Sequence, residues 1–166
     1  MGEQIETLAR FAAETQLEEI PVPVREHAKR VLRDTLGVIL GGSVRPEVAA
    51  LRNRLAANNS TGATVYAPGA PVHDARTAAL LNGIAGRAIE LCEGLRLVSG
   101  QAAIQILPGV LAVGEQFMAS GKTLLAALVS GYEVAARLGL AFTPRALAHQ
   151  NGQAMMLAAA AASIMA

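Results

Sequence analysis

The segment 87–101 carries the residues best suited to chemistry. Arg87, Glu90 and Glu93 follow one another three residues apart, and Arg96 continues the row. On a helix this spacing brings the side chains to one face. Two neighbouring carboxylates can separate their pKa values and serve as acid and base. The competing interpretation is an exposed row of ion pairs, each worth about 0.2–0.5 kcal/mol, and spacing alone favours that row.

Two further groups of interest are the thiol of Cys92 and the imidazole of His149. Cys92 is the single cysteine, which excludes an internal disulfide and is typical of a reducing compartment. A histidine near a helix start usually caps or packs, although one that faces a cleft can act as an acid or base. His27 and His73 are far from His149 in the sequence, and no pair of ligands has metal-site spacing. We therefore expect neither a metal nor a cofactor.

The stretch ASGKTL at 119–124 contains the GKT of a phosphate-binding loop. The full motif needs a glycine five residues before Gly121, and Gln116 stands there. Ser120 as the cap of a helix explains the stretch better, because a serine at this position accepts unpaired backbone N–H groups.

Composition bounds the class of protein. The 166 residues are 52% hydrophobic, 16% charged and 3% aromatic, so the core must be built from small aliphatic side chains that suit packed helices. The net charge is +1 and the basic residues are scattered, which gives no case for nucleic acid. The longest apolar run, 154–166, has 13 residues, whereas a membrane span needs about 20. We expect a cytoplasmic protein with no membrane contact.

Hydrophobic periodicity predicts about seven helices in one all-α domain covering residues 1–166. Asp74 and Ser120 are the expected caps of two of them. The last helix carries no stop signal, so we expect the chain to be the N-terminal part of a longer two-domain protein. The expected elements are helices at 3–18, 23–41, 46–55, 74–91, 102–118, 121–142 and 149–166, with a strand-like piece at 63–69.

Four stretches resemble the N-terminal helical domain of the MmgE/PrpD family, which includes 2-methylcitrate dehydratase, cis-aconitate decarboxylase and iminodisuccinate epimerase. They are DTLGVILGG (34–42), ALLNGIAGRAIEL (79–91), ILPGVLAVGEQFMASGKTLLAALVSGYEVAARLG (106–139) and HQNGQAMMLAAAAA (149–162). The resemblance implies an all-α multi-helix bundle that carries most of an active site, a smaller α/β lid domain, and a homodimer formed through the helical part.

The motifs depart from the family where its chemistry is expected. Where family members read HALDFDDTH, this chain reads RAIELCEGL at 87–95, with Arg87 in place of the histidine. The paired aspartates have become Cys92 and Glu93, and a histidine-proline motif has become Gln101 followed by two alanines. The later histidine is kept as His149.

The resemblance implies a lyase or isomerase that removes a C–H proton from a small di- or tricarboxylate. In that hypothesis His149 acts as the acid or the base, and Glu93 or Glu90 acts as the other member of the acid–base pair. Arg87, Gln101 and Cys92 bind the substrate, with Arg87 able to hold a carboxylate through its bidentate fork. The alternative is a non-catalytic helical module for dimerisation or partner binding that has lost the site.

Overall fold

The computed structural model describes residues 2–55 and 62–142, and these form an all-α bundle. This confirms the expected fold class. The helix expected at 149–166, and His149 with it, lie outside the described residues. The α-helices are α1 (Gly2–Glu14), α2 (Val22–Ser43), α3 (Pro46–Arg54), α4 (Ala75–Arg87), α5 (Ala102–Gln116) and α6 (Gly121–Ala141), with 3₁₀ turns η1 (Leu17–Glu19) and η2 (Arg96–Val98).

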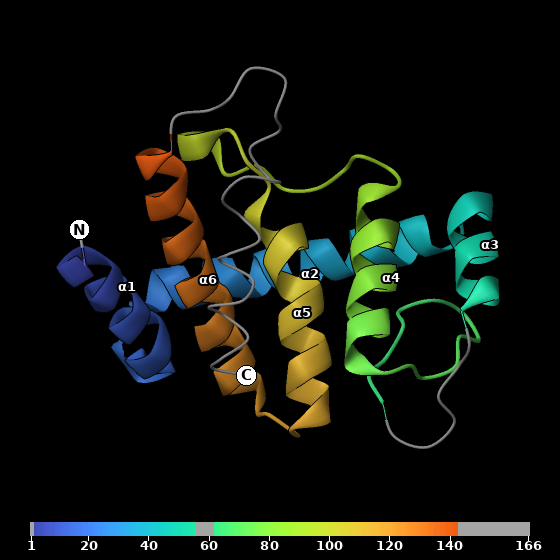
Figure 1. Ribbon diagram of the computed structural model, residues 1–166, viewed down its shortest axis with the longest axis horizontal. Helices are drawn as coiled ribbons and strands as arrows, with labels where there is room; N and C mark the ends of the chain where they lie inside the picture. The colour runs from blue at the N-terminus through green and yellow to red at the C-terminus, as the bar shows by residue number, and fades with distance from the viewer. Residues whose placement is uncertain (1, 56–61, 143–166) are drawn as a thin grey trace.

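The helices form two crossed layers (Figure 1). Helices α4, α5 and α6 stand side by side, each antiparallel to the next, and the long helix α2 crosses behind all three. Helix α1 lies beside α6 at one end of α2, and α3 lies beside α4 at the other. Because α4 and α5 are antiparallel, the end of α4 and the start of α5 meet at the same end of the bundle.

Glycines allow close packing both between the two layers and within one of them. A Cβ added to Gly42 of α2 would lie 1.8 Å from the carbonyl oxygen of Ala85 in α4. A Cβ added to Gly86 would lie 2.0 Å from the Cδ1 of Ile104 in α5. Gly42 therefore lets two helix backbones approach closely, and Gly86 leaves space for the Ile104 side chain, as the small-residue composition predicts.

The predicted helix over 74–91 is too long, because α4 ends at Arg87. Asp74 is its cap as predicted, and accepts the amides of Arg76 and Thr77 at 3.1 Å. Three residues beyond the helix, Glu90 has a φ of 53°, a left-handed conformation that no α-helix contains. Nothing in the local sequence ends the helix, since AIEL keeps the helical hydrophobic spacing.

The predicted strand at 63–69 is also wrong. Within the described residues it makes a single β-bridge, between Ala63 and His73. Its backbone is held instead by a side chain of α4. The Asn82 amide accepts from Tyr66 N and donates to Thr64 O, both at 2.9 Å. Asn82 is 1% exposed, so these two bonds satisfy a polar group inside the core.

One described helix, α6, is long and apolar enough to cross a membrane by length and composition alone. Half of its most apolar 18-residue stretch is buried inside the fold. Ala127 and Ala135, which lie on its buried face, are fully covered by the neighbouring helices. This is the pattern of a core helix.

Candidate functional site

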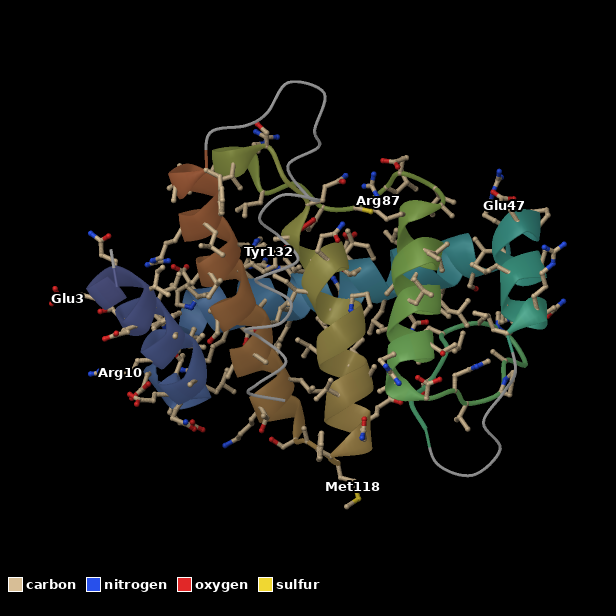
Figure 2. The ribbon with its side chains drawn as sticks, viewed as in Figure 1. Glu3, Arg10, Glu47, Arg87, Met118 and Tyr132 are labelled. Carbon is tan, nitrogen blue, oxygen red and sulfur yellow. The ribbon has the colours of Figure 1, made fainter. Side chains whose placement is uncertain are left out.

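The segment between α4 and α5 gathers the candidate residues at one end of the bundle. Arg87 closes α4, Gln101 precedes α5, and Glu90, Cys92 and Glu93 lie between them. Figure 2 shows Arg87 at the upper end of α4, away from Met118 at the opposite end of the bundle. His149 lies outside the described residues, so its position relative to this site is not described.

The guanidinium of Arg87 contacts three other side chains of this segment. Its Nη1 donates to the Oε1 of Gln101 and lies 3.8 Å from the Sγ of Cys92. Its Nη2 donates to the Oε1 of Glu90 at 2.7 Å. The thiol of Cys92 in turn donates to the carbonyl of Gly86 at 3.1 Å. One guanidinium thus joins the end of α4, the connecting segment and the start of α5.

Glu93 is held from a different direction. Its Oε1 accepts the backbone amide of Ala103 at 2.6 Å, at the first turn of α5. The same oxygen accepts the hydroxyl of Tyr132, which comes from α6. A carboxylate at the start of a helix is stabilised by the unpaired N–H groups and the positive end of the helix dipole. Glu93 therefore serves as a distant cap for α5, whose own N-cap residue Gln101 makes no side-chain cap bond.

The second oxygen of Glu93 is the unusual feature of the site. Oε2 is buried, and none of the described residues donates a hydrogen bond to it. A buried carboxylate oxygen without a donor is costly, and such atoms are rare in folded proteins. Within the described part of the chain, Oε2 is therefore an acceptor that a further donor group could use.

Helix α5 offers an internal comparison at its other end. Glu115 also accepts a tyrosine hydroxyl and a backbone amide, from Tyr66 at 2.8 Å and Thr64 at 2.5 Å. These donors are divided between its two oxygens, so both oxygens have a partner. At Glu93 both donors converge on one oxygen. The free oxygen of Glu93 thus results from the arrangement of its donors.

Burial and charge shift the ionisation of the groups around Glu93. Burial, followed by the negative charge of Glu93, raises the pKa of the Tyr132 hydroxyl far above its usual value. Tyr132 is therefore a hydrogen-bond donor and keeps its proton at neutral pH. Burial also raises the pKa of the Cys92 thiol, and outweighs the opposing effect of the Arg87 guanidinium. Cys92 is accordingly a neutral thiol at pH 7.

The row of ion pairs expected on a helical face does not form. Only its first member is present, the pair between Arg87 and Glu90. Because the helix ends at Arg87, Glu93 turns toward α5 and α6. Arg96 lies in η2 and is exposed. The carboxylates therefore divide into one that is exposed and bound to Arg87 and one that is partly buried beside Tyr132.

Tyr132 is the residue that sequence reasoning missed. The chain has two tyrosines and no tryptophan, and Tyr132 interrupts an apolar helix. A tyrosine buried on such a face usually needs a partner for its hydroxyl. That rule marks Tyr132 as a polar core position, although it cannot identify Glu93 as the partner.

Arg87 also reaches a groove of about 620 Å³ between α3, α4 and α5. The groove is mainly apolar and is lined by Leu80, Ile84 and Pro108 among others, but not by Glu93 or Tyr132. Arg87 thus lines an apolar groove and also contacts Gln101, Cys92 and Glu90. Across residues 2–55 and 62–142, no group of three histidine, cysteine or acidic side chains could hold a metal ion.

Comparison with known proteins supports the family resemblance. The model of the MmgE/PrpD N-terminal domain matches residues 6–165, nearly the whole chain. A search of curated proteins finds no significant match. The matched region includes every candidate residue described above.

Proposed function

On the premise that this chain belongs to the MmgE/PrpD family, we propose that it contributes the active site of a lyase or isomerase. The substrate is a small di- or tricarboxylate, and the reaction begins by removing a proton from a carbon beside a carboxylate. The supporting observation is the Oε2 of Glu93, a buried carboxylate oxygen that receives no hydrogen bond from the described residues. General bases contribute about 10²–10⁴-fold to such reactions.

Each residue of the site has a role in this proposal. Glu93 Oε2 takes the proton, while Tyr132 and the Ala103 amide hold Oε1 and fix the orientation of the carboxylate. Arg87 binds a carboxylate of the substrate, helped by Gln101, which fixes the guanidinium. Cys92 lies against Arg87 as a neutral neighbour. His149 is the acid that returns a proton to the product.

Arg87 also gives an electrostatic reason for the substrate class. A carboxylate base repels an anionic substrate unless a cation compensates, and a guanidinium pairs with carboxylates through two parallel hydrogen bonds. The proton removed is weakly acidic, so the enolate-like charge that develops also needs a nearby donor. Arg87 can serve both purposes because it is 31% exposed in its side chain and therefore accessible.

The direct test is hydrogen exchange at carbon. The gene product, expressed at its natural length, is incubated in D₂O with malate, citrate and their dehydrated counterparts, and loss of the C–H signal is followed by NMR. Glu93→Gln should lower the exchange rate at least 100-fold. Glu115→Gln is the matched control, because Glu115 accepts the same kinds of donor at the other end of α5.

Equal rates in the two variants would exclude Glu93 as the base. His149→Ala should also abolish turnover, and unchanged turnover would remove His149 from the mechanism. If the natural-length protein exchanges none of these compounds, the helical dimerisation or partner-binding module becomes the better proposal. Exposed Leu80 beside the groove favours that alternative, because an open apolar groove suits a partner helix or a second copy of the chain.

A further inference from the structure

The contacts of Arg87 differ in how firmly each partner is held. Gln101 is fixed at the start of α5, which packs in the core. Glu90 lies in the connecting segment with 66% of its side chain exposed. Among the described residues, Arg87 supplies the one side-chain contact of Glu90. Gln101 thus positions the guanidinium, whereas the ion pair between Glu90 and Arg87 can break without disturbing the core.

The pair between Arg87 and Glu90 has the chemistry of a bound ligand. Glu90 presents a carboxylate, the same group that the proposed substrate carries. It uses one oxygen on one nitrogen, Oε1 on Nη2, at 2.7 Å. A guanidinium can offer two parallel N–H groups to a free carboxylate, which is a better arrangement. A free carboxylate that accepts both N–H groups therefore binds Arg87 more strongly than Glu90 does.

The backbone at Glu90 contributes to this arrangement. Its φ of 53° is uncommon for a residue other than glycine or asparagine. Its amide lies 3.3 Å from the carbonyl of Arg87 and closes a turn directly after the helix. This turn keeps the carboxylate of Glu90 within reach of Arg87 although the helix has ended.

We infer that Glu90 is an internal carboxylate that occupies the binding site of the substrate carboxylate on Arg87 and must be displaced when a ligand binds. The inference rests on the proposed function, since it assumes a carboxylate ligand at Arg87. A tethered carboxylate competes at an effective concentration in the millimolar range. Any carboxylate ligand must therefore compete with Glu90, which weakens its binding to Arg87, and a ligand with a single carboxylate has no second carboxylate to offset that loss. In this inference Glu90 tunes the affinity for carboxylates and is not the base.

Cys92 provides a reporter for this site. Its Sγ lies 3.8 Å from Arg87 Nη1, so a carboxylate bound to Arg87 covers the thiol. The experiment measures the rate at which iodoacetamide alkylates Cys92 in the full chain, by mass spectrometry of the Cys92 peptide. Succinate and tricarballylate are titrated at constant ionic strength, with acetate as the monocarboxylate. The concentration that halves the rate reports the affinity.

The expected result is specific to Glu90. Glu90→Gln removes the charge and keeps the shape, so the half-protecting concentration of succinate should fall about two- to fivefold, the factor that an exposed ion pair is worth. Glu26→Gln is the matched control, because Glu26 forms an exposed pair with a different cation, Lys29, at 2.7 Å and does not line the groove at Arg87. It should leave the midpoint unchanged. Arg87→Gln should abolish protection, and Arg87→Lys should weaken it, because lysine lacks the two-pronged donor.

The outcomes separate this inference from the proposed reaction. If the half-protecting concentration of succinate in Glu90→Gln equals or exceeds that of the parent chain, Glu90 is not an internal competitor. The same conclusion follows if succinate protects Cys92 in neither protein. Protection that shifts as expected, in a protein that exchanges no C–H proton, supports the carboxylate site and removes the lyase proposal. If the parent chain and Glu90→Gln exchange the C–H proton with the same dependence on substrate concentration, the proposed reaction stands and only the competing role of Glu90 is excluded.

Discussion

Tyr132 of α6 donates its hydroxyl proton to the same oxygen, Glu93 Oε1, that accepts the amide of Ala103 at the start of α5. This contact connects residues 39 apart in the sequence and joins two neighbouring helices through one carboxylate. It fixes the plane of the carboxylate, and among residues 2–55 and 62–142 no donor reaches its other oxygen. The stability of the bundle and the orientation of the proposed base therefore depend on the same bond.

Removal of the Tyr132 hydroxyl should affect both properties. Tyr132→Phe leaves a partly buried carboxylate with one donor fewer, so we expect the free energy of unfolding to fall by about 1–3 kcal/mol. Urea denaturation followed by circular dichroism measures this change. We also expect slower C–H exchange of the substrate, because the base loses its orientation.

Tyr66→Phe is the control for this prediction. Tyr66 also donates to a glutamate, Glu115, at 2.8 Å, and this glutamate lies at the opposite end of α5 from the amide that Glu93 accepts. Tyr66→Phe should lower stability to a similar extent and leave proton exchange unchanged. A Tyr132→Phe protein with the parent exchange rate would show that Tyr132 has a structural role only.

The close approach of α2 and α4 gives a second prediction. Gly42→Ala places a methyl group 1.8 Å from a backbone oxygen of Ala85, which cannot move aside as a flexible side chain could. We expect a loss of about 3 kcal/mol or more in the free energy of unfolding, because the helices must separate. Gly37→Ala in the same helix meets no atom within 4 Å and should be neutral or stabilising by up to about 1 kcal/mol. Equal stabilities of the two variants would contradict the close helix contact.

Much of the fold could be predicted from the sequence because its signals are local. Ser120 caps α6 and accepts the amide of Thr123 at 3.2 Å, as its residue type and position predict. The end of α4 could not be predicted, because Ile89 and Leu91 continue the helical spacing. Ile89 is in fact placed against α2, where a Cβ on Gly41 would lie 3.3 Å from its Cδ1. The tertiary contact overrides the local periodicity.

The candidate site was predictable only in part. The spacing of Arg87 and Glu90 correctly indicates their ion pair, which forms although the helix has ended. The separation of Glu93 from that row could not be predicted, since its partners Ala103 and Tyr132 belong to other helices. Sequence spacing reports neighbours within one element, whereas the partners of Glu93 are set by how three elements pack.

Alkaline pH should destabilise the fold through its two tyrosines. Burial, with a neighbouring glutamate in each case, raises the pKa of both Tyr66 and Tyr132 above the usual 10.0. Above pH 10 the unfolded chain therefore binds fewer protons than the folded chain. The stabilisation from these groups is complete below pH 10 and is lost as pH rises toward the folded pKa values.

This pH dependence has a direct optical readout. The chain has no tryptophan, so absorbance near 295 nm reports tyrosinate from two residues only. We expect little tyrosinate at pH 10 and a steep rise at higher pH that coincides with unfolding by circular dichroism. The double variant Tyr66→Phe and Tyr132→Phe should lose this alkaline decline in stability. Two tyrosines that ionise near pH 10 in a protein that stays folded would contradict the prediction.

Asn82 holds the segment that enters α4, and its removal should loosen that segment. Asn82→Ala leaves the amide of the partly buried Tyr66 and the carbonyl of the exposed Thr64 without their partners, and removes a buried side chain. Because an unsatisfied buried group costs about 1–3 kcal/mol, we expect the free energy of unfolding to fall by an amount in this range. Asn53→Ala, at an exposed asparagine on α3, should change stability by less than about 0.5 kcal/mol.

Amide hydrogen exchange at Tyr66 measures how firmly the segment itself is held. Its rate should rise in Asn82→Ala by more than global unfolding accounts for, whereas an increase that only tracks global stability would mean that Asn82 supports the core and does not hold the segment.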